Sequence, residues 1–262
     1  MTRVAVVTGA ARGIGAATVR ALAADGWDVV AVDSCRDDPR LPYALGTEAE
    51  LRAVAAEPAA DGRVTPLVAD AADAAELADA VALAEHKHGA LDAMIAAAGV
   101  IAGGVPLWEM PREQEEAVLE VDLRAVLTAA RVAVPALLRR PQPRDARFIA
   151  VASTAATRGL PMLAAYGAAK AGVVGLVRAL AAELRGSGVT ANAVSPGATR
   201  TTMLEETARL YALDTPEWFA GQQPLERLLD PGEVAAMIAW VAGPAASGVT
   251  GAALAVDGGL AV

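Results

Sequence analysis

Short apolar runs alternate along the chain with longer, Ala-rich stretches of helical pattern. Apolar residues follow one another within the runs, which is typical of parallel strands that are covered on both faces. The strand-like runs are Val4–Thr8, Asp28–Asp33, Val64–Ala69, Leu91–Ala97, Arg147–Ala152, Val189–Ser195 and Ala253–Val256. Helices are expected near 13–25, 73–88, 112–140, 163–186 and 231–243. This alternation predicts a doubly wound α/β fold around a parallel sheet.

Capping signals support several of the helix starts. Asp73–Glu76 and Asp230–Glu233 each match a capping box, in which the N-cap side chain and a Glu three residues later satisfy each other's backbone N–H groups. Residues 34–62 fall outside the alternation and hold an extra helix, Thr47–Glu57, with a third capping box. Residues 198–229 also fall outside it, and a connection of this length is typical of a lid. Since no linker-like stretch or internal repeat occurs, we expect a single domain over the whole chain.

Charge and cysteine content exclude several classes of protein. The net charge is −9, from 22 basic and 31 acidic residues, whereas nucleic-acid binding needs clustered Lys and Arg. Cys35 is the one cysteine, which excludes an internal disulfide framework and a cysteine-based zinc site and fits a reducing cytoplasm. The uncharged stretch Ala93–Trp108 has 16 residues and is interrupted by Gly and Pro, so we expect no membrane span. His86 and His88 do not share a helix face, so we expect no metal site.

A glycine-rich turn directly follows the first strand and begins a helix. Its sequence, Thr8-Gly-Ala-Ala-Arg-Gly-Ile-Gly15, lets the backbone approach a pyrophosphate, which then meets the free N–H groups of the helix N-terminus. The cofactor contacts expected in this turn are Gly9, Arg12, Gly13, Ile14 and Gly15. The alternative interpretation is a tight strand-to-helix turn that binds no ligand.

Two aspartates at strand ends are placed to contact the adenosine half of a dinucleotide. Asp33 ends the second strand, where a carboxylate accepts from the ribose hydroxyls and repels a 2′-phosphate, so it favours NAD over NADP. Arg12 is a weaker argument for NADP. Asp70, with Ala71, follows the third strand and is expected at the adenine. The alternatives are a cap or turn residue for Asp33 and a loop start for Asp70.

Tyr166 and Lys170 stand four residues apart in a helical stretch, so their side chains share one face. A nearby ammonium favours the phenolate, so Lys170 is expected to lower the pKa of Tyr166 and to make it a general acid or base near neutral pH. Of the 22 basic residues only two are Lys, and one stands here. Ser153 ends the fifth strand and is expected to hold the substrate oxygen. The alternatives are two surface residues on a helix and, for Ser153, a cap or turn.

Together these features resemble the short-chain dehydrogenase/reductase family over nearly the whole chain. The glycine turn, a serine ahead of Tyr-x-x-x-Lys, and Pro-Gly-x-x-x-Thr after the sixth strand match the family's motifs. The resemblance implies a seven-stranded parallel sheet of Rossmann type and a homotetramer built on the helices near 112–140 and 163–186. The cofactor contacts that it adds to those above are Ala97, Gly99, Tyr166, Lys170, Pro196, Gly197, Thr199 and Thr201.

Two positions depart from the family pattern. After the fourth strand the family has Asn-Asn-Ala-Gly, whereas this chain has Ala96-Ala-Ala-Gly99, which loses side-chain bonds that pin the cofactor loop. The family's fourth catalytic residue is an Asn that holds a proton-relaying water, and here Asp122 takes its place and is expected to hold the same water. Its charge also stabilises the Lys170 ammonium and opposes lowering of the Tyr166 pKa, which predicts a reduced rate or an alkaline optimum.

The segment 34–62 has a narrower resemblance. Asp33-Ser-Cys35 and Pro42–Leu51 resemble the mycofactocin-coupled subfamily. In that subfamily an insert beside the adenosine half covers NAD so that it does not exchange freely, and mycofactocin reoxidises the bound NADH. The alternative is an ordinary surface insertion on an enzyme whose NAD exchanges.

The sequence therefore predicts a cytoplasmic, NAD-dependent oxidoreductase that transfers hydride between nicotinamide and a secondary alcohol or ketone. Tyr166 is the expected acid or base, and Lys170 binds ribose and tunes Tyr166. Ser153 orients the substrate oxygen, and Asp122 belongs to the proton relay. The lid's lack of placed charges favours a small or mid-sized apolar substrate. The competing hypothesis is a non-catalytic NAD-binding regulatory protein of the same fold, which the altered Asn positions support.

Overall fold

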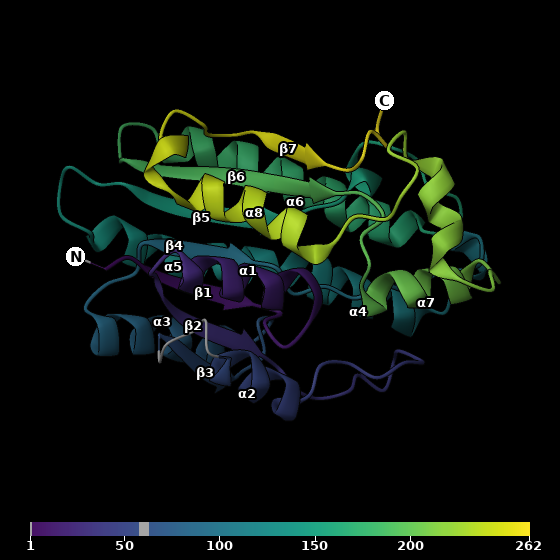
Figure 1. The fold of residues 1–262 in the computed structure, drawn as a ribbon, viewed down its shortest axis with the longest axis horizontal. Coiled ribbons are helices and arrows are strands. Elements are labelled where there is room, and N and C mark those ends of the chain that lie inside the picture. The colour runs from purple at the N-terminus through teal and green to yellow at the C-terminus, as the bar shows by residue number, and fades with distance from the viewer. Residues whose placement is uncertain (1, 58–62) are drawn as a thin grey trace.

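All seven predicted strands form and lie side by side in one parallel sheet (Figure 1). The computed structural model describes residues 2–57 and 63–262. The strand order is β3-β2-β1-β4-β5-β6-β7, which confirms the doubly wound, seven-stranded sheet in a single Rossmann-type domain. The strands are β1 (Val4–Thr8), β2 (Asp28–Asp33), β3 (Val64–Val68), β4 (Ala93–Ala96), β5 (Ala146–Val151), β6 (Val189–Pro196) and β7 (Ala253–Val256).

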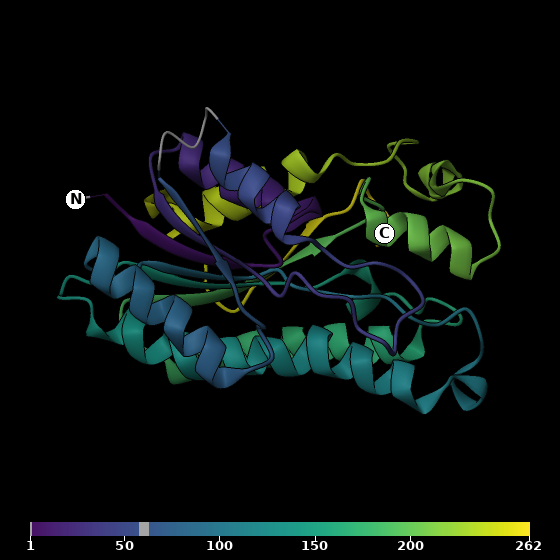
Figure 2. The ribbon, with the colours of Figure 1, turned by 90° about the horizontal axis from the view of Figure 1, so that it is seen from below.

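Helices cover both faces of the sheet (Figure 2). One face carries α1 (Gly13–Ala24), α2 (Glu48–Ala56) and α8 (Pro231–Ala242), and the other carries α3 (Ala74–His88), α4 (Arg112–Leu119), α5 (Ala125–Arg139) and α6 (Ala164–Glu183). A separate apolar cluster fills each interface, with Val19 of α1 and Ile238 of α8 in one and Val81 of α3 and Val177 of α6 in the other. Central strands such as β5 are therefore buried along their whole length, which explains their continuous apolar sequence.

Two of the three predicted capping boxes have the expected contact from the Glu. The Glu50 carboxylate accepts from the backbone N–H of Thr47, and that of Glu233 accepts from the backbone N–H of Asp230. The prediction for Asp73–Glu76 is wrong in part. Asp73 does cap α3, but the Glu76 carboxylate accepts from the N–H of Asp70, at 2.6 Å, and so braces the loop after β3 instead.

The single helix predicted near 112–140 is interrupted. A π-helical turn, Glu120–Arg124, separates α4 from α5 and brings the fully buried Asp122 to the inner side of the helix. Turns of this kind insert one extra residue per turn and are frequent at functional sites. The periodicity of apolar residues cannot show such an insertion, because the pattern on both sides remains helical.

Helix α6 has 20 residues and a mean hydropathy of 1.2, so by length and composition it could cross a membrane. In this fold it lies against the sheet, where Val173, Val174 and Val177 belong to the apolar core. Its apolar character therefore has a structural explanation in the packing of the domain.

Strand order reverses at β1, with β2 and β3 on one side and β4 to β7 on the other. In doubly wound sheets the ligand crevice lies beyond the carboxyl ends of the strands at this reversal. Helix α7 (Thr202–Leu210) and the following 3₁₀ segment Pro216–Gln222 lie beyond that same edge of the sheet (Figures 1 and 2).

Candidate active site

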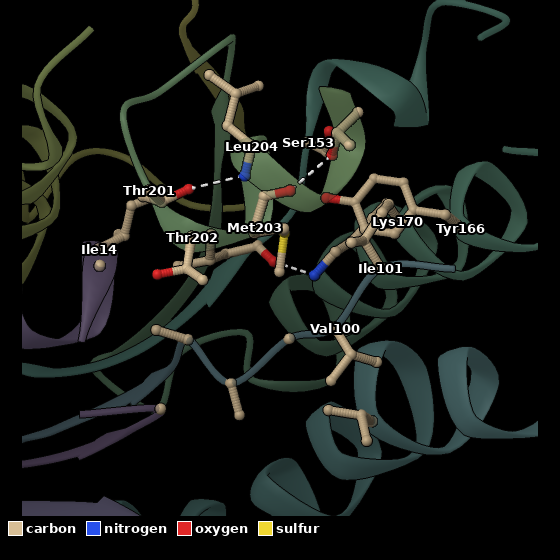
Figure 3. Close-up of a pocket in the computed structure, with 18 of the residues that line it drawn as sticks. Ile14, Val100, Ile101, Ser153, Tyr166, Lys170, Thr201, Thr202, Met203 and Leu204 are labelled. Atoms are coloured by element: carbon tan, nitrogen blue, oxygen red, sulfur yellow. Dashed lines mark hydrogen bonds between the residues drawn. The ribbon is translucent and has the colours of Figure 1, made fainter. Parts of the chain in front are cut away.

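A cleft of about 960 Å³ lies at the carboxyl edge of the sheet. Every predicted site residue lines it except Asp122, which lies behind Lys170. Figure 3 shows Ser153, Tyr166 and Lys170 together on one side of the cleft, facing the segment from Thr201 to Leu204. The cleft has the size of a ligand site that holds both a dinucleotide and a small substrate.

The glycine turn after β1 forms the bottom of the cleft. Gly9 has a φ of +67°, which favours glycine, and a Cβ there would lie 2.7 Å from Cα of Ala98. A Cβ on Gly15 would lie 1.9 Å from the carbonyl oxygen of Gly9. The N-terminus of α1 has no side-chain cap and no acidic residue in its first turn, so its N–H groups are free to bind an anion. This cradle fits a pyrophosphate.

The adenosine end of the cleft is bounded by Asp33 and Asp70. The Asp33 carboxylate accepts from the N–H groups of Ala11 and Cys35, each at 3.1 Å, which fixes its orientation at the edge of the cleft. Asp70 forms an ion pair with Arg36 at 2.7 Å. Both carboxylates line the cleft where the sequence places the ribose and the adenine.

Residues 36–46, which we name the strap, run along the mouth of the cleft and line it at several positions. The guanidinium of Arg12 donates to the carbonyl of Ala44 at 2.9 Å. The hydroxyl of Tyr43 accepts from the N–H of Ile101 at 2.8 Å. Tyr43 and Ala44, which are neighbours in the strap, thus tie it to the loop after β4 and to the glycine turn.

A third contact joins the strap to the helix that carries Asp122. Arg40 lies between Asp38 and Glu120, with ion pairs of 2.6 Å to each. Glu120 begins the π-helical turn, and Leu41 of the strap is buried in the same apolar cluster as Tyr166. The strap therefore spans the cleft from the adenosine end to the catalytic end.

Tyr166, Lys170 and Ser153 converge from two neighbouring elements. Tyr166 and Lys170 lie one turn apart on α6, and the Lys170 ammonium is 5.7 Å from the centre of the Tyr166 ring. The ammonium also donates to the carbonyl of Val151, at 3.1 Å, at the end of β5. Ser153 follows β5 and caps a short 3₁₀ helix, Thr154–Ala156, through the N–H of Ala155. This arrangement brings a phenol, an ammonium and a hydroxyl to one end of the cleft.

Asp122 contacts Lys170 directly. Its Oδ1 atom is 3.0 Å from Nζ of Lys170, and its Oδ2 atom accepts from the N–H of Val100 at 3.4 Å. The two groups therefore form a direct ion pair, and the water that we expect Asp122 to hold stays a prediction. Gly99 makes room for this pair, since a Cβ there would lie 2.9 Å from Oδ1 of Asp122.

The predicted lowering of the Tyr166 pKa is wrong for this arrangement. Burial raises the pKa of Tyr166, Lys170 lowers it, Asp122 raises it again and Ser153 lowers it, and the net pKa is above the usual value. Burial by itself would lower the pKa of Lys170, but Asp122 and Tyr166 raise it above its usual value. The four-residue spacing indicates that Lys170 attracts a phenolate on Tyr166. It does not show that the phenol is buried, and burial disfavours the phenolate.

The loop after β4 is held although it lacks the family's asparagines. The hydroxyl of Thr8, which ends β1, accepts from the N–H groups of Ala97 and Ala98 at 3.1 and 3.2 Å. The backbone of the loop is thus pinned from the neighbouring strand. Thr8 therefore holds the backbone of the loop, although the side-chain bonds of the family's asparagines are absent at Ala96 and Ala97.

The loop after β6 borders the nicotinamide end. Thr199 and Thr201 line the cleft, and the Thr201 hydroxyl accepts from the N–H of Leu204 and so caps α7. The methyl group of Thr201 also faces Gly13 of the first turn, where a Cβ would approach it to 3.4 Å. Pro196 ends β6, and Gly197 follows it in the same wall. These residues lie together as the sequence predicts.

Segment 198–229 forms the wall opposite Tyr166, and its lining is mostly apolar. The side chains of this half of the cleft, from the segment and from the loops facing it, are Ile101, Leu160, Leu163, Met203, Leu204, Tyr211, Leu213, Trp218, Phe219 and Leu260. The Tyr211 hydroxyl donates to the carbonyl of Pro161 at 2.6 Å, and its ring meets Phe219 edge to face. The segment therefore encloses a space suited to an apolar molecule.

Two contributors were not found from the sequence. Gln223 is almost fully buried and accepts from the N–H of Ala198 at 2.8 Å, which ties the lid to the loop after β6. A Cβ on Gly197 would lie 2.5 Å from Oε1 of Gln223, so the two positions are matched. The second is Tyr43, whose bond to Ile101 is a contact between residues 58 positions apart. Neither contact has a local sequence signal.

Comparison with known proteins agrees with this geometry. The family model described as enoyl-(acyl carrier protein) reductase matches residues 9–261. A cis-4-hydroxycyclohexanecarboxylate dehydrogenase of Sinomonas cyclohexanicum is 38% identical over 257 residues, which cover 98% of this chain and 96% of that protein. A 3-oxoacyl-[acyl-carrier-protein] reductase of Thermotoga maritima is 33% identical over 263 residues, covering 99% and 98%. The crystal structure of carveol dehydrogenase from Mycobacterium avium in complex with NAD superposes with a TM-score of 0.91 at 29% identity, covering 98% and 97%.

The chain therefore belongs to the short-chain dehydrogenase/reductase family. It is an NAD(P)-dependent oxidoreductase of that family, and its relatives are dehydrogenases and reductases.

Proposed function

We propose that the protein interconverts a secondary alcohol and a ketone with NAD as the cofactor. The observation that carries the proposal is the convergence of Tyr166, Lys170 and Ser153 at the end of a cleft that contains a pyrophosphate cradle. Bound NAD would supply hydride transfer at its nicotinamide ring. The Asp33 carboxylate at the ribose position supports NAD over NADP, because it would repel a 2′-phosphate.

In this proposal Tyr166 exchanges a proton with the oxygen of the substrate. Ser153 holds that oxygen beside the phenol. Lys170 stays protonated between Asp122, Tyr166 and the carbonyl of Val151, so it stabilises a phenolate on Tyr166 and binds ribose hydroxyls. Asp122 does not line the cleft, and it therefore acts as a positioning residue for Lys170.

Replacing Tyr166 by Phe tests the catalytic assignment. We expect kcat for alcohol oxidation to fall at least about 100-fold, because the proton acceptor is lost while the ring still fills its place. Tyr211→Phe also removes one hydroxyl, from the lid instead of the catalytic end, and is expected to keep most of kcat. If the Tyr166→Phe protein retained every function of the wild type, the competing hypothesis of a non-catalytic regulatory protein would be favoured.

The substrate class that we propose is a small or mid-sized apolar secondary alcohol. The apolar wall of segment 198–229 supports it. The names of two relatives point to ring alcohols, since carveol and 4-hydroxycyclohexanecarboxylate both carry a hydroxyl group on a ring. A panel of secondary ring alcohols, assayed with an artificial electron acceptor, tests this class against open-chain alcohols.

We further propose that the strap retains NAD and that mycofactocin reoxidises it as NADH. The three anchors of the strap support retention, because Arg12, Tyr43 and Arg40 all tie it across the cleft. A cofactor beneath it would leave only after these contacts open. The alternative is an ordinary enzyme of the same family in which NAD exchanges freely.

Cofactor retention is tested on purified, extensively dialysed protein. We expect NAD or NADH to remain by absorbance and mass spectrometry, and added mycofactocin to oxidise the retained NADH. Tyr43→Phe combined with Arg40→Met is expected to release the cofactor, whereas Arg52→Met, on α2, is the matched control because its ion pair with Glu48 is exposed. A dialysed protein that is empty and turns over readily with added NAD would exclude the mycofactocin assignment.

We also propose a cytoplasmic homotetramer. Leu127 and Leu138 of α5 are 40% and 38% exposed, and such apolar positions on the helices expected at the interface would be covered by a second copy. Light scattering of the purified protein tests the assembly, and Leu127→Glu with Leu138→Glu should dissociate it.

A further inference from the structure

The two halves of the cleft differ in charge. The cofactor half is lined by both signs, with arginines at 12, 36 and 40, Lys170, and carboxylates at 33, 37, 38, 70 and 120. Among the residues that the structure describes, the half beneath the lid is lined by apolar and neutral polar side chains and by a single charged residue, Arg158. An isolated charge in an otherwise neutral wall is a candidate for recognising a ligand of opposite charge.

Most cations of the cleft already have an acidic partner. Arg36 pairs with Asp70, Arg40 with Asp38 and Glu120, and Lys170 with Asp122. Within residues 2–57 and 63–262, Arg12 and Arg158 are the two cations of the cleft without an ion pair. Arg12 lies at the pyrophosphate cradle, where a bound dinucleotide would bring anions to it. Arg158 likewise has no acidic partner among the described residues, and it lies in the half of the cleft beneath the lid.

The position of Arg158 is fixed by two hydrogen bonds. Its backbone N–H donates to the carbonyl of Thr154 at 2.8 Å, which places it one helical turn beyond the residue that follows Ser153. One guanidinium nitrogen, Nη1, donates to the carbonyl of Leu260 at 2.5 Å, and Leu260 itself lines the cleft. This bond holds the guanidinium against the wall and leaves its other N–H groups available for a carboxylate.

We propose that Arg158 binds a carboxylate carried by the substrate, so that the cleft accepts hydroxy acids or keto acids with an apolar body. This inference deepens the proposed function and depends on it for the reacting alcohol. Arg is suited to this task because its planar group can bind both oxygens of a carboxylate.

The test measures binding, so that it does not require turnover. Cyclohexanecarboxylate and its methyl ester have the same ring and differ in charge, and calorimetry gives the Kd of each for the NAD-loaded protein. We expect the acid to bind about 10- to 100-fold more tightly than the ester, which is the range of a charge-assisted hydrogen bond. In Arg158→Gln this preference should disappear through weaker binding of the acid, and Arg158→Lys should retain part of it.

The matched control is Arg200→Gln, which removes the same charge from an exposed residue that pairs with Glu217 outside the cleft. It should leave the preference unchanged. Equal affinity of the wild type for acid and ester would overturn the inference, as would an Arg158→Gln protein that loses affinity for both by the same factor. Either result would leave the proposed function intact, because that function is tested separately by the kcat of Tyr166→Phe for alcohol oxidation.

Discussion

The cofactor end and the substrate end of the cleft are built from different kinds of chemical group. The cofactor end depends on backbone: glycines at 9, 13 and 15 and the free N-terminus of α1 form its cradle. The substrate end depends on side chains, contributed by α7, the segment Pro216–Gln222 and the loops that face them. A backbone cradle accepts one geometry only, whereas a wall of side chains can be changed residue by residue. The difference predicts where substitutions disable the protein and where they retune it.

The largest effect is expected from Gly15→Ala. A Cβ at this position would lie 1.9 Å from the carbonyl oxygen of Gly9, and backbone has little freedom to move away. We expect NAD binding to weaken at least about 100-fold, on the scale of a steric cost of about 3 kcal/mol, together with a lower Tm. Calorimetric titration and thermal unfolding measure the two changes.

Gly232→Ala is the control for this substitution. Gly232 lies in the first turn of α8, and a Cβ there would have no atom within 4 Å. The added methyl group should leave NAD affinity unchanged and keep or slightly raise Tm, since Ala is the better helix former. If Gly15→Ala and Gly232→Ala both bound NAD as tightly as the wild type, the backbone of the glycine turn would be adaptable. The contrast between a rigid cofactor end and a variable substrate end would then not hold.

The glycines of the first turn can be predicted from the sequence, and the reason is physical. A turn that needs positive φ and close backbone approach permits only glycine, so its geometry appears directly as the spacing Gly9, Gly13, Gly15. The order of strands and helices was predicted for the same reason, because burial on both faces leaves a continuous apolar run. At the catalytic end, the four-residue spacing of Tyr166 and Lys170 gave their shared helix face.

The other features of the site could not be predicted from the sequence, because they depend on contacts between residues far apart in the chain. The π-helical turn that brings Asp122 to Lys170 leaves no mark in the apolar periodicity. The net pKa of Tyr166 depends on burial, which spacing does not report. Gln223 and Arg158 lie in loops without a pattern, and their roles follow only from what surrounds them in three dimensions.

An intermediate effect is expected at the junction of the two ends. Asp122→Asn removes the carboxylate that faces Lys170 and that helps to raise the pKa of Tyr166. The phenolate is the form that accepts a proton, so oxidation rises with pH as Tyr166 ionises. Lowering its pKa moves that rise to lower pH. We therefore expect the pH–rate profile of oxidation to shift toward neutral pH, with a higher rate at pH 7.

The pKa of Tyr166, and so the position of the pH–rate profile, depends on the groups that face its phenol. They are Lys170 on its own helix, Asp122 on the π-helical turn and Ser153 after β5. Ser153→Ala removes a hydroxyl that lowers the pKa, so its profile should move in the opposite direction, to higher pH. A profile that stays in place in Asp122→Asn would show that the carboxylate does not act on the phenol, and Asp122 would then be a structural residue only.

The smallest effect is expected from Tyr211→Phe in the lid. The Tyr211 hydroxyl donates to the carbonyl of Pro161 at 2.6 Å, and this bond joins the end of α7 to the loop that follows Ser153. A partly exposed hydrogen bond is worth about 1 kcal/mol, so we expect KM to rise about fivefold with kcat nearly unchanged. Hydrogen exchange of the amides in α7 should become faster in the variant, because the lid opens more often. A raised KM with unchanged exchange would mean that the hydroxyl contacts the substrate itself, and the lid would then be part of the rigid wall.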